Sequence, residues 1–234
     1  MATYLQLCQQ VASDSATFAE GAISTVTGQT GRKAKVVRMV NQAWRSIQNA
    51  HHTWNWMRSS MTLTLSEDTR YYAGSSGTDM FGDTRFGEFL CQGLGDNRFM
   101  IYDSTIGLSD KAPMQFVPYD TFYARDLFNE DTGKPVRFTI APDGRLAVHQ
   151  IPDGNDYKII APYRKSIQTL SADSDTPEMP ADFHDVIASL AVQFIHLHDE
   201  ATGLLPLWKL RENFDFCRLE ARQLPAITIP EPLA

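Results

Sequence analysis

The side chains best suited to chemistry form a short polar cluster near residue 200. His196 and His198 are followed directly by Asp199 and Glu200, and imidazole and carboxylate groups are common metal ligands. Residues two apart on a helix point in directions that differ by about 200°, so His196 and His198 cannot chelate one ion together. We expect no metal site here. We interpret His198 as a cation at a helix end and His196 as part of a polar helix face.

Local motifs of common catalytic sites are missing from the sequence. It contains no G-x-S-x-G elbow for a serine nucleophile and no phosphate-binding loop with the usual glycine spacing. Cys8, Cys91 and Cys217 are an odd set without C-x-x-C spacing, which indicates neither a disulfide framework nor a zinc ribbon. We therefore expect no cofactor and no enzymatic activity. A metal-dependent hydrolase built on the cluster near residue 200 is the weaker alternative.

Length and composition set the frame for any function. The chain has 234 residues, 43% of them hydrophobic and 21% charged, which is typical of one or two globular domains. The longest apolar stretch without charge, Val186–Ile195, is far shorter than the ~20 residues that a membrane helix needs. The first basic residue is Arg32, so we expect no secretory signal and synthesis in a cytoplasm.

Positive charge is concentrated in one part of a chain whose formal net charge is -7. The stretch from Gly21 to Ser66 has six Lys and Arg residues and no Asp or Glu, so the remainder carries a net -13. Three interpretations remain open: a solvated helix face, charge complementarity between subunits, or a nucleic-acid-binding module. The candidates for charge contacts between subunits are Arg32, Lys35, Arg38 and Arg45.

Hydrophobic periodicity predicts helices at the start of the chain and strands after them. Apolar residues recur at helical spacing from Tyr4 to Val11 and again from Val36 to Ile47, which predicts two amphipathic helices. Met61, Leu63 and Leu65 then alternate with polar residues, as in a strand with one buried face.

The middle of the chain reads as β structure with one short helix. Pro118 can begin that helix. Two proline-containing turns separate three alternating runs, which predicts a three-stranded antiparallel meander; the runs are Val136–Ile140, Leu146–Gln150 and Tyr157–Tyr163. The glycine-rich segment Tyr71–Asp96 has no clear strand pattern, and its length suggests a loop that reaches another protein.

Helical spacing returns near the C-terminus. One seam consists of Phe183, Ile187, Leu190, Phe194 and Leu197. A second, strict heptad seam consists of Leu207, Leu210, Phe214, Cys217, Ala221 and Leu224. Two adjacent seamed helices predict an antiparallel hairpin in which the seams are buried.

The last ten residues, Pro225–Ala234, contain three prolines and cannot form a helix. Ile227 and Ile229 would point to the same side of an extended segment, which could add a strand to another molecule or fill a groove on it. The alternative is a terminus that is disordered or packs on its own chain.

These elements together predict an α+β protein. A helical bundle from the N- and C-terminal helices would accompany a central antiparallel β domain. The expected boundaries are 1–60 for the N-terminal helices, 61–170 for the β domain, 171–224 for the C-terminal hairpin and 225–234 for the tail.

Several phrases spread over nearly the whole chain resemble the head-to-tail adaptor proteins of tailed bacteriophages. None of them is a catalytic motif, so the resemblance depends on their number and order. The phrases are Thr3–Gln10, Asn41–Asn49, Trp54–Ser59, Phe116–Asp120, Pro180–His184 and Gln223–Ala234.

This resemblance implies a structural virion protein in the neck of the particle, assembled in the host cytoplasm. Its expected partners are the portal protein, other copies in a ring of twelve, and a downstream tail or nozzle protein, with DNA passing through the channel without specific binding. On the C-terminal tail, the expected contacts with portal or neighbour are Ile227, Ile229, Pro230 and Leu233. A neck or tail-completion protein farther from the portal is the nearest alternative.

Overall fold

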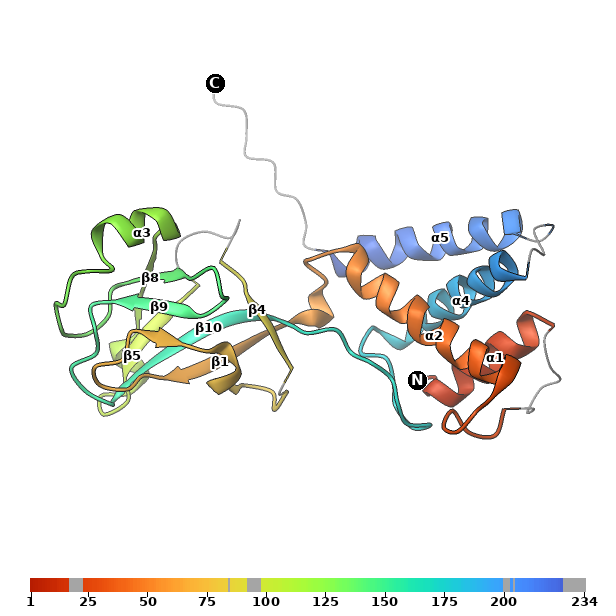
Figure 1. The fold of residues 1–234 in the computed structure, drawn as a ribbon, viewed down its shortest axis with the longest axis horizontal. Helices are drawn as coiled ribbons and strands as arrows, with labels where there is room; N and C mark the ends of the chain where they lie inside the picture. Colours follow the sequence, from red (N-terminus) through yellow and green to blue (C-terminus); the bar gives the residue numbers. More distant parts are fainter. Residues whose placement is uncertain (17–22, 84, 92–97, 200–202, 204, 225–234) are drawn as a thin grey trace, which may run out of the picture. The chain divides into compact units, whose positions relative to one another are not determined.

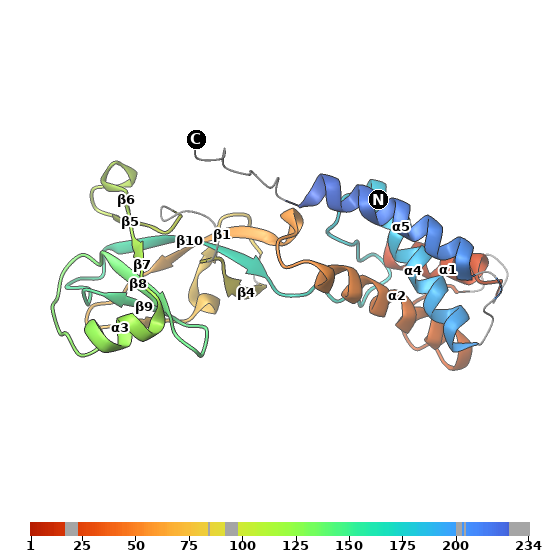
Figure 2. The same ribbon diagram turned by 90° about the horizontal axis from the view of Figure 1, so that it is seen from above.

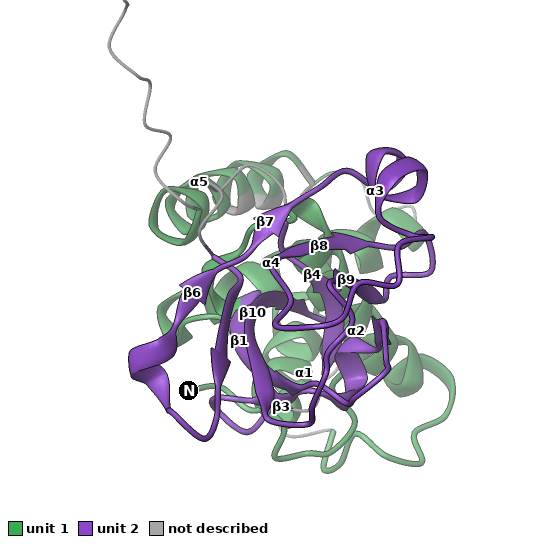
Figure 3. Cartoon of the chain, turned by 90° about the vertical axis from the view of Figure 1, so that its left-hand side faces the viewer, with its two compact units in different colours: residues 1–56, 167–234 green, residues 57–166 purple. Residues whose placement is uncertain are grey.

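The computed structural model describes the chain except for residues 17–22, 84, 92–97, 200–202, 204 and 225–234 (Figure 1). The chain divides into two compact units (Figure 3). Residues 1–56 and 167–234 make the helical unit, and residues 57–166 make the β unit. The predicted fold class, α+β with N- and C-terminal helices in one bundle and antiparallel sheets between them, is confirmed.

Helix α4 is the centre of the helical unit and packs against all its other long helices (Figure 2). Ten of its 15 residues are buried, including four polar ones, as expected for a helix with neighbours on several sides. The helices are α1 (Tyr4–Asp14), α2 (Gly31–Ala50), the short η4 (Ala181–Phe183), α4 (His184–His198) and α5 (Leu205–Gln223).

Polar side chains fix α1, α2 and the segment that precedes α4. A capping box formed by Thr3 and Gln6 begins α1. The amide of Asn41 on α2 donates to the Tyr4 hydroxyl (2.7 Å) and to the Leu170 carbonyl (2.8 Å), and its oxygen accepts from the Leu170 N–H (3.1 Å). These bonds satisfy backbone groups in a segment without regular structure. Burial of those groups without hydrogen bonds would cost free energy.

In the part that the structure describes, the β unit contains two sheets and the helix α3 (Tyr119–Arg125). In the larger sheet the order is β3-β1-β10-β5-β6, with β4 also on β10, and in the smaller it is β2-β9-β8-β7. The strands are β1 (Arg58–Thr64), β2 (Tyr71–Tyr72), β3 (Thr78–Asp79), β4 (Phe86–Phe89), β5 (Met100–Asp103), β6 (Ala112–Pro113), β7 (Gln115–Phe116), β8 (Arg137–Ile140), β9 (Leu146–His149) and β10 (Tyr157–Lys165). Three short 3-10 turns complete the unit and its border: η1 (Asn55–Met57), η2 (Gly74–Ser76) and η3 (Leu108–Asp110).

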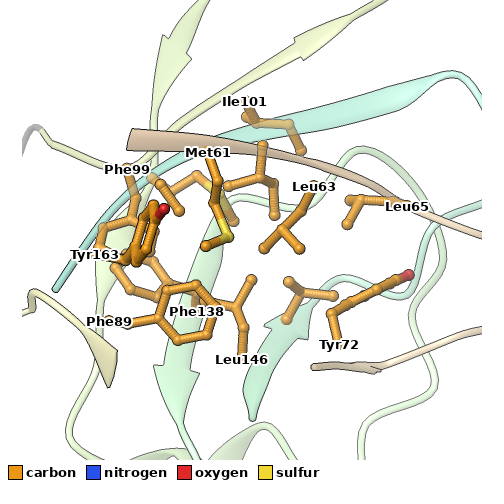
Figure 4. Packing of buried hydrophobic residues seen from close by; sticks show 14 residues of the cluster. Met61, Leu63, Leu65, Tyr72, Phe89, Phe99, Ile101, Phe138, Leu146 and Tyr163 are labelled. Atoms are coloured by element: carbon orange, nitrogen blue, oxygen red, sulfur yellow. The ribbon is translucent and has the colours of Figure 1, made fainter. Parts of the chain in front are cut away.

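Alternate residues of β1 and the residue that follows it form the centre of the β-unit core. Met61, Leu63 and Leu65 are buried and face Phe138 and Leu146 of the smaller sheet (Figure 4). The alternation that predicted a strand with one buried face is therefore confirmed in this segment. The two sheets share one apolar interior.

The predicted three-stranded meander is wrong in its third strand. β8 and β9 pair as expected, from Arg137↔His149 to Ile140↔Leu146. β10, however, belongs to the other sheet and pairs with β1 over seven positions. The residues after β9 bond elsewhere: the Asp68 N–H donates to the Pro152 carbonyl, and the Glu67 N–H to the Asn155 side chain. These contacts carry the chain across to the second sheet.

Three short strands of the glycine-rich segment belong to the sheets, contrary to the expectation of one long loop. β2, β3 and β4 lie within it and pair with β9, β1 and β10 respectively. Close approach explains two of its glycines: a Cβ on Gly74 would lie within the Phe86 ring, and one on Gly87 would lie 2.7 Å from the Arg164 carbonyl oxygen. Short strands crowded by aromatic rings leave little alternating pattern in a sequence.

Candidate interaction surfaces

The basic face of α2 divides into a paired half and an unpaired half. At its start, the Arg32 guanidinium lies 2.7 Å and the Lys35 ammonium 2.5 Å from the carboxylate of Asp199, just after α4. The hydrogen bond from Lys35 is the main reason that the pKa of Asp199 is lowered, and Arg32 adds to it. Two of the four residues predicted for subunit contacts thus already have a partner within the chain.

Arg38 and Arg45, the other two, line a polar groove of about 550 Å³ along the second half of α2. Both are exposed, and no ion pair joins either of them to another described residue. Gln42 and Asn49 alternate with them on the same helix face, and Gln168 lies on the opposite wall. The groove therefore offers two positive charges and several amide groups to a partner that carries carboxylates or free backbone groups.

Helix α5 turns its strongest hydrophobic pattern away from the unit, so the predicted burial of the heptad seam is wrong. Leu207, Leu210 and Phe214 are 66%, 69% and 65% exposed, and Cys217 and Ala221 are also exposed. We call these five residues the outer stripe. Of the predicted seam, only Leu224 is half-buried.

The opposite side of α5 makes the contact with α4. Leu219 is fully buried, and it is nine residues from Leu210, which places the two about 180° apart on an α-helix. Beside it, Phe216 stacks on His51 with ring centres 6.2 Å apart, and the His51 ring lies 2.5 Å from the Glu220 carboxylate. The predicted hairpin of α4 and α5 is present, but the packed side of α5 carries Leu219 and Phe216 instead of the heptad residues.

The α4 seam is buried at its start and open at its end. Phe183 and Ile187 are buried, Leu190 and Phe194 are half-buried, and Leu197 is 53% exposed. The expectation of a wholly buried seam is therefore correct only for Phe183 and Ile187.

The histidines near residue 200 lie apart, as helical geometry requires. His196 is 8% exposed, so its assignment to a polar face is wrong, whereas His198 lies at the helix end beside Asp199. Within the described parts of the chain, no three His, Cys, Asp or Glu side chains are grouped so as to hold a metal ion. The predicted tail contacts Ile227, Ile229, Pro230 and Leu233 fall outside the described residues.

A carboxylate in the β unit, Asp79, organises a turn that the sequence pattern did not reveal. It accepts hydrogen bonds from the hydroxyls of Ser59 (2.5 Å) and Tyr163 (2.8 Å) and from the N–H groups of Phe81 and Asp83. Burial would raise the pKa of Asp79, but these bonds outweigh it and lower the pKa to about 2. An aspartate that accepts hydrogen bonds from the N–H groups of the residues after it is typical of turns. This tendency was the signal for the turn that the sequence offered.

Asp126 does the same for the loop after α3. It is 1% exposed and pairs with the guanidinium groups of Arg125 (2.9 Å) and Arg137 (3.3 Å). Burial would raise its pKa, yet these partners lower it. Arg70 donates to the carbonyls of Asp126 and Leu127. These polar groups hold the α3 region in place through ion pairs and hydrogen bonds within the chain.

The helical unit therefore presents surfaces suited to other proteins: a groove with unpaired arginines and a helix with an outward heptad. Such features are typical of proteins that bind other proteins. The family model described as SU10 adaptor protein matches residues 2–207. The chain belongs to the SU10 adaptor protein family, a phage head–tail adaptor family and a structural class of protein. The resemblance seen in the sequence is thereby confirmed.

A comparison with curated proteins finds no match. In the described parts of the chain, no helix combines the length and the hydropathy that crossing a membrane would demand.

Proposed function

We propose that this protein forms a ring beneath the phage portal and joins the head to the tail, so that DNA passes through its centre. Membership in the adaptor family carries the proposal. The surfaces support it: unpaired Arg38 and Arg45 and the outer stripe of α5 are the kinds of groups that bind neighbouring proteins. The ring would hold twelve copies, matching the symmetry expected of a portal.

The net charge suits a conduit. Twelve copies of a chain with net charge -7 would carry about -84, and a lumen of that sign repels DNA and lets it slide. Binding proteins that grip DNA instead release counterions through an excess of Lys and Arg.

The C-terminal decapeptide completes the proposal as the segment that holds portal or neighbour. Ile227, Ile229, Pro230 and Leu233 supply apolar contacts on an extended backbone that prolines keep from folding into a helix. A downstream tail or nozzle protein would bind the opposite side of the ring. The protein would reside in the neck of the virion.

Negative-stain imaging of the purified protein, alone and mixed with purified portal, tests the function. We expect rings bound to the portal. The variant lacking 225–234 should keep its thermal unfolding temperature and lose portal binding, whereas Ser24→Ala, a control at an exposed residue of the helical unit, should retain both. Full assembly by the truncated protein would refute the role of the tail. Rings that bind a tail-side protein but not portal would favour a neck or tail-completion protein.

A further inference from the structure

We propose that the outer stripe of α5 binds an aromatic patch beside α3 on the next copy of this chain. The patch consists of Tyr119, Tyr123 and Phe128. This contact deepens the ring assembly proposed above and rests on it. It would join the helical unit of one copy to the β unit of another.

The outer stripe has the form of a surface made for a partner. Its spacings of three and four residues are those of heptad packing, which places side chains where another surface can receive them. Three of its large side chains are about two-thirds exposed. The inner face of the same helix is already occupied, because Leu219 is buried in the contact with α4. Rotation of α5 to bury the stripe would therefore expose Leu219.

Basic groups border the stripe. The Arg218 guanidinium lies over the Phe214 ring, 5.7 Å from its centre, and Arg211 and Lys209 are exposed on the same helix. Arg218 lies 3.7 Å from Asp215 and Arg211 lies 4.0 Å from exposed Asp185, both long and solvent-exposed ion pairs, while half-buried Glu220 pairs with His51. The face that a partner meets is thus apolar with a positive border.

The aromatic patch has the opposite border. Its rings contact one another, with centres 6.2 Å apart between Tyr119 and Tyr123 and 5.6 Å between Tyr123 and Phe128. Tyr123 is 50% and Phe128 76% exposed. The exposed carboxylates around them are Asp120, Glu130 and Asp131.

Asp126 pairs with both Arg125 and Arg137, so these three groups keep one net positive charge. The three exposed carboxylates outnumber it, and the border of the patch remains acidic. The same ion pairs anchor the loop that carries Phe128, so the patch is held in position before any partner arrives.

Apolar character and charge of the border therefore match between two different surfaces of one chain. Such a contact is heterologous, and repetition around an axis closes a ring. Pairing α5 with α5 of another copy would instead be isologous, and in an antiparallel arrangement it would bring the Arg211 and Arg218 borders together. Charge thus favours the α3 patch of a second copy as the occupant.

Cys217 provides the test, since it lies in the stripe and is exposed while Cys8 is buried and Cys91 half-buried. Burial raises the pKa of the Cys8 and Cys91 thiols to about 12, so both react slowly. We would measure the rate of thiol labelling of the full-length protein over a range of concentrations, and in rings assembled on portal. Labelling of Cys217 should slow at least tenfold in rings and, with rising concentration, in the free protein.

The variants Tyr123→Ser and Phe128→Ser should restore rapid labelling, while Leu108→Ser, which removes another exposed apolar residue of the β unit, should not. Glu130→Lys should likewise restore rapid labelling, and combination with Arg218→Glu should return the protection.

Rapid labelling in intact rings would overturn the contact, as would protection that persists in both patch variants. Protection independent of concentration would show a contact within one chain and would also overturn it. If no rings form on portal, concentration-dependent protection that the patch variants abolish still supports the contact and leaves only the ring function refuted. Absence of both rings and protection refutes the two together.

Discussion

Helices α2 and α5 both carry strong apolar periodicity, yet they use it in opposite ways. The apolar positions of α2, including Val40, Trp44 and Ile47, are fully buried inside the helical unit. The more regular heptad of α5 faces outward, and Leu219 on its other side makes the internal contact. Apolar periodicity therefore shows that one face of a helix is suited to packing against a partner. It does not report whether that partner is in the same chain.

The largest effect should come from the inward face of α2. Trp44 is fully buried and lies near Trp56, with ring centres 6.5 Å apart. Trp44→Ala should lower the free energy of unfolding by about 3–5 kcal/mol, because a large cavity would remain. Denaturant unfolding measures this, with the exposed neighbour Arg45→Ala as control. A loss below about 1 kcal/mol would mean that α2 does not serve the core.

A matched pair of leucines tests the two faces of α5 directly. Leu219→Ala should lower the free energy of unfolding by about 2–4 kcal/mol, since the side chain is fully buried. Leu210→Ala should change it by no more than about 0.5 kcal/mol, because that side chain is 69% exposed. The same denaturant experiment compares them. Equal losses would show that α5 has no outward face, and the comparison with α2 would fail.

A smaller loss of stability is expected when a polar contact in the β unit, the turn organised by Asp79, is removed. Asp79→Asn should lower the free energy of unfolding at pH 7 by about 1–2 kcal/mol, allowing for partial exposure. The pKa of Asp79 is lowered from 3.8 to about 2. Its stabilisation is therefore complete above the ordinary pKa and is lost as pH falls toward 2. Unfolding curves of wild type and variant should converge over that interval, while exposed Asp156→Asn should differ little at any pH.

The smallest effect on stability, with a separate effect on assembly, is expected at the outward face of α2. Charge reversal at Arg38 and Arg45 should leave the unfolding temperature nearly unchanged, since both side chains are exposed. It should weaken association between subunits, more so at low than at high salt. Sedimentation at two ionic strengths measures this, with Arg145→Glu in the β unit as control. Association that does not depend on salt would remove the groove from the interface.

Local pattern was sufficient for much of the fold and failed where distant contacts decide. The helices around Tyr4–Val11 and Val36–Ile47 and the strand around Met61–Leu65 follow from period alone, because each buries one face. The meander failed because the residues after β9 bond to the β1–β2 loop, 85 or so positions earlier, as in the pair Glu67 and Asn155. No local signal encodes that partner.

The site divides in the same way. Arg32, Lys35, Arg38 and Arg45 stand out in the sequence as one basic stretch, and only the structure separates the first two, paired with Asp199, from the last two, which line a groove. Asp79 was missed because its partners come from three separate segments.

By itself, the sequence determined the α+β class, the adaptor resemblance and the presence of an apolar heptad in the last helix. Only the tertiary structure decided that this heptad faces outward and that β10 joins the second sheet. The physical reason is that residue spacing fixes which side chains share a face, whereas the burial of that face depends on which distant segments compete to cover it. On α5, the face that carries Leu219 is buried where the helix packs on α4, and the outer stripe lies at the surface.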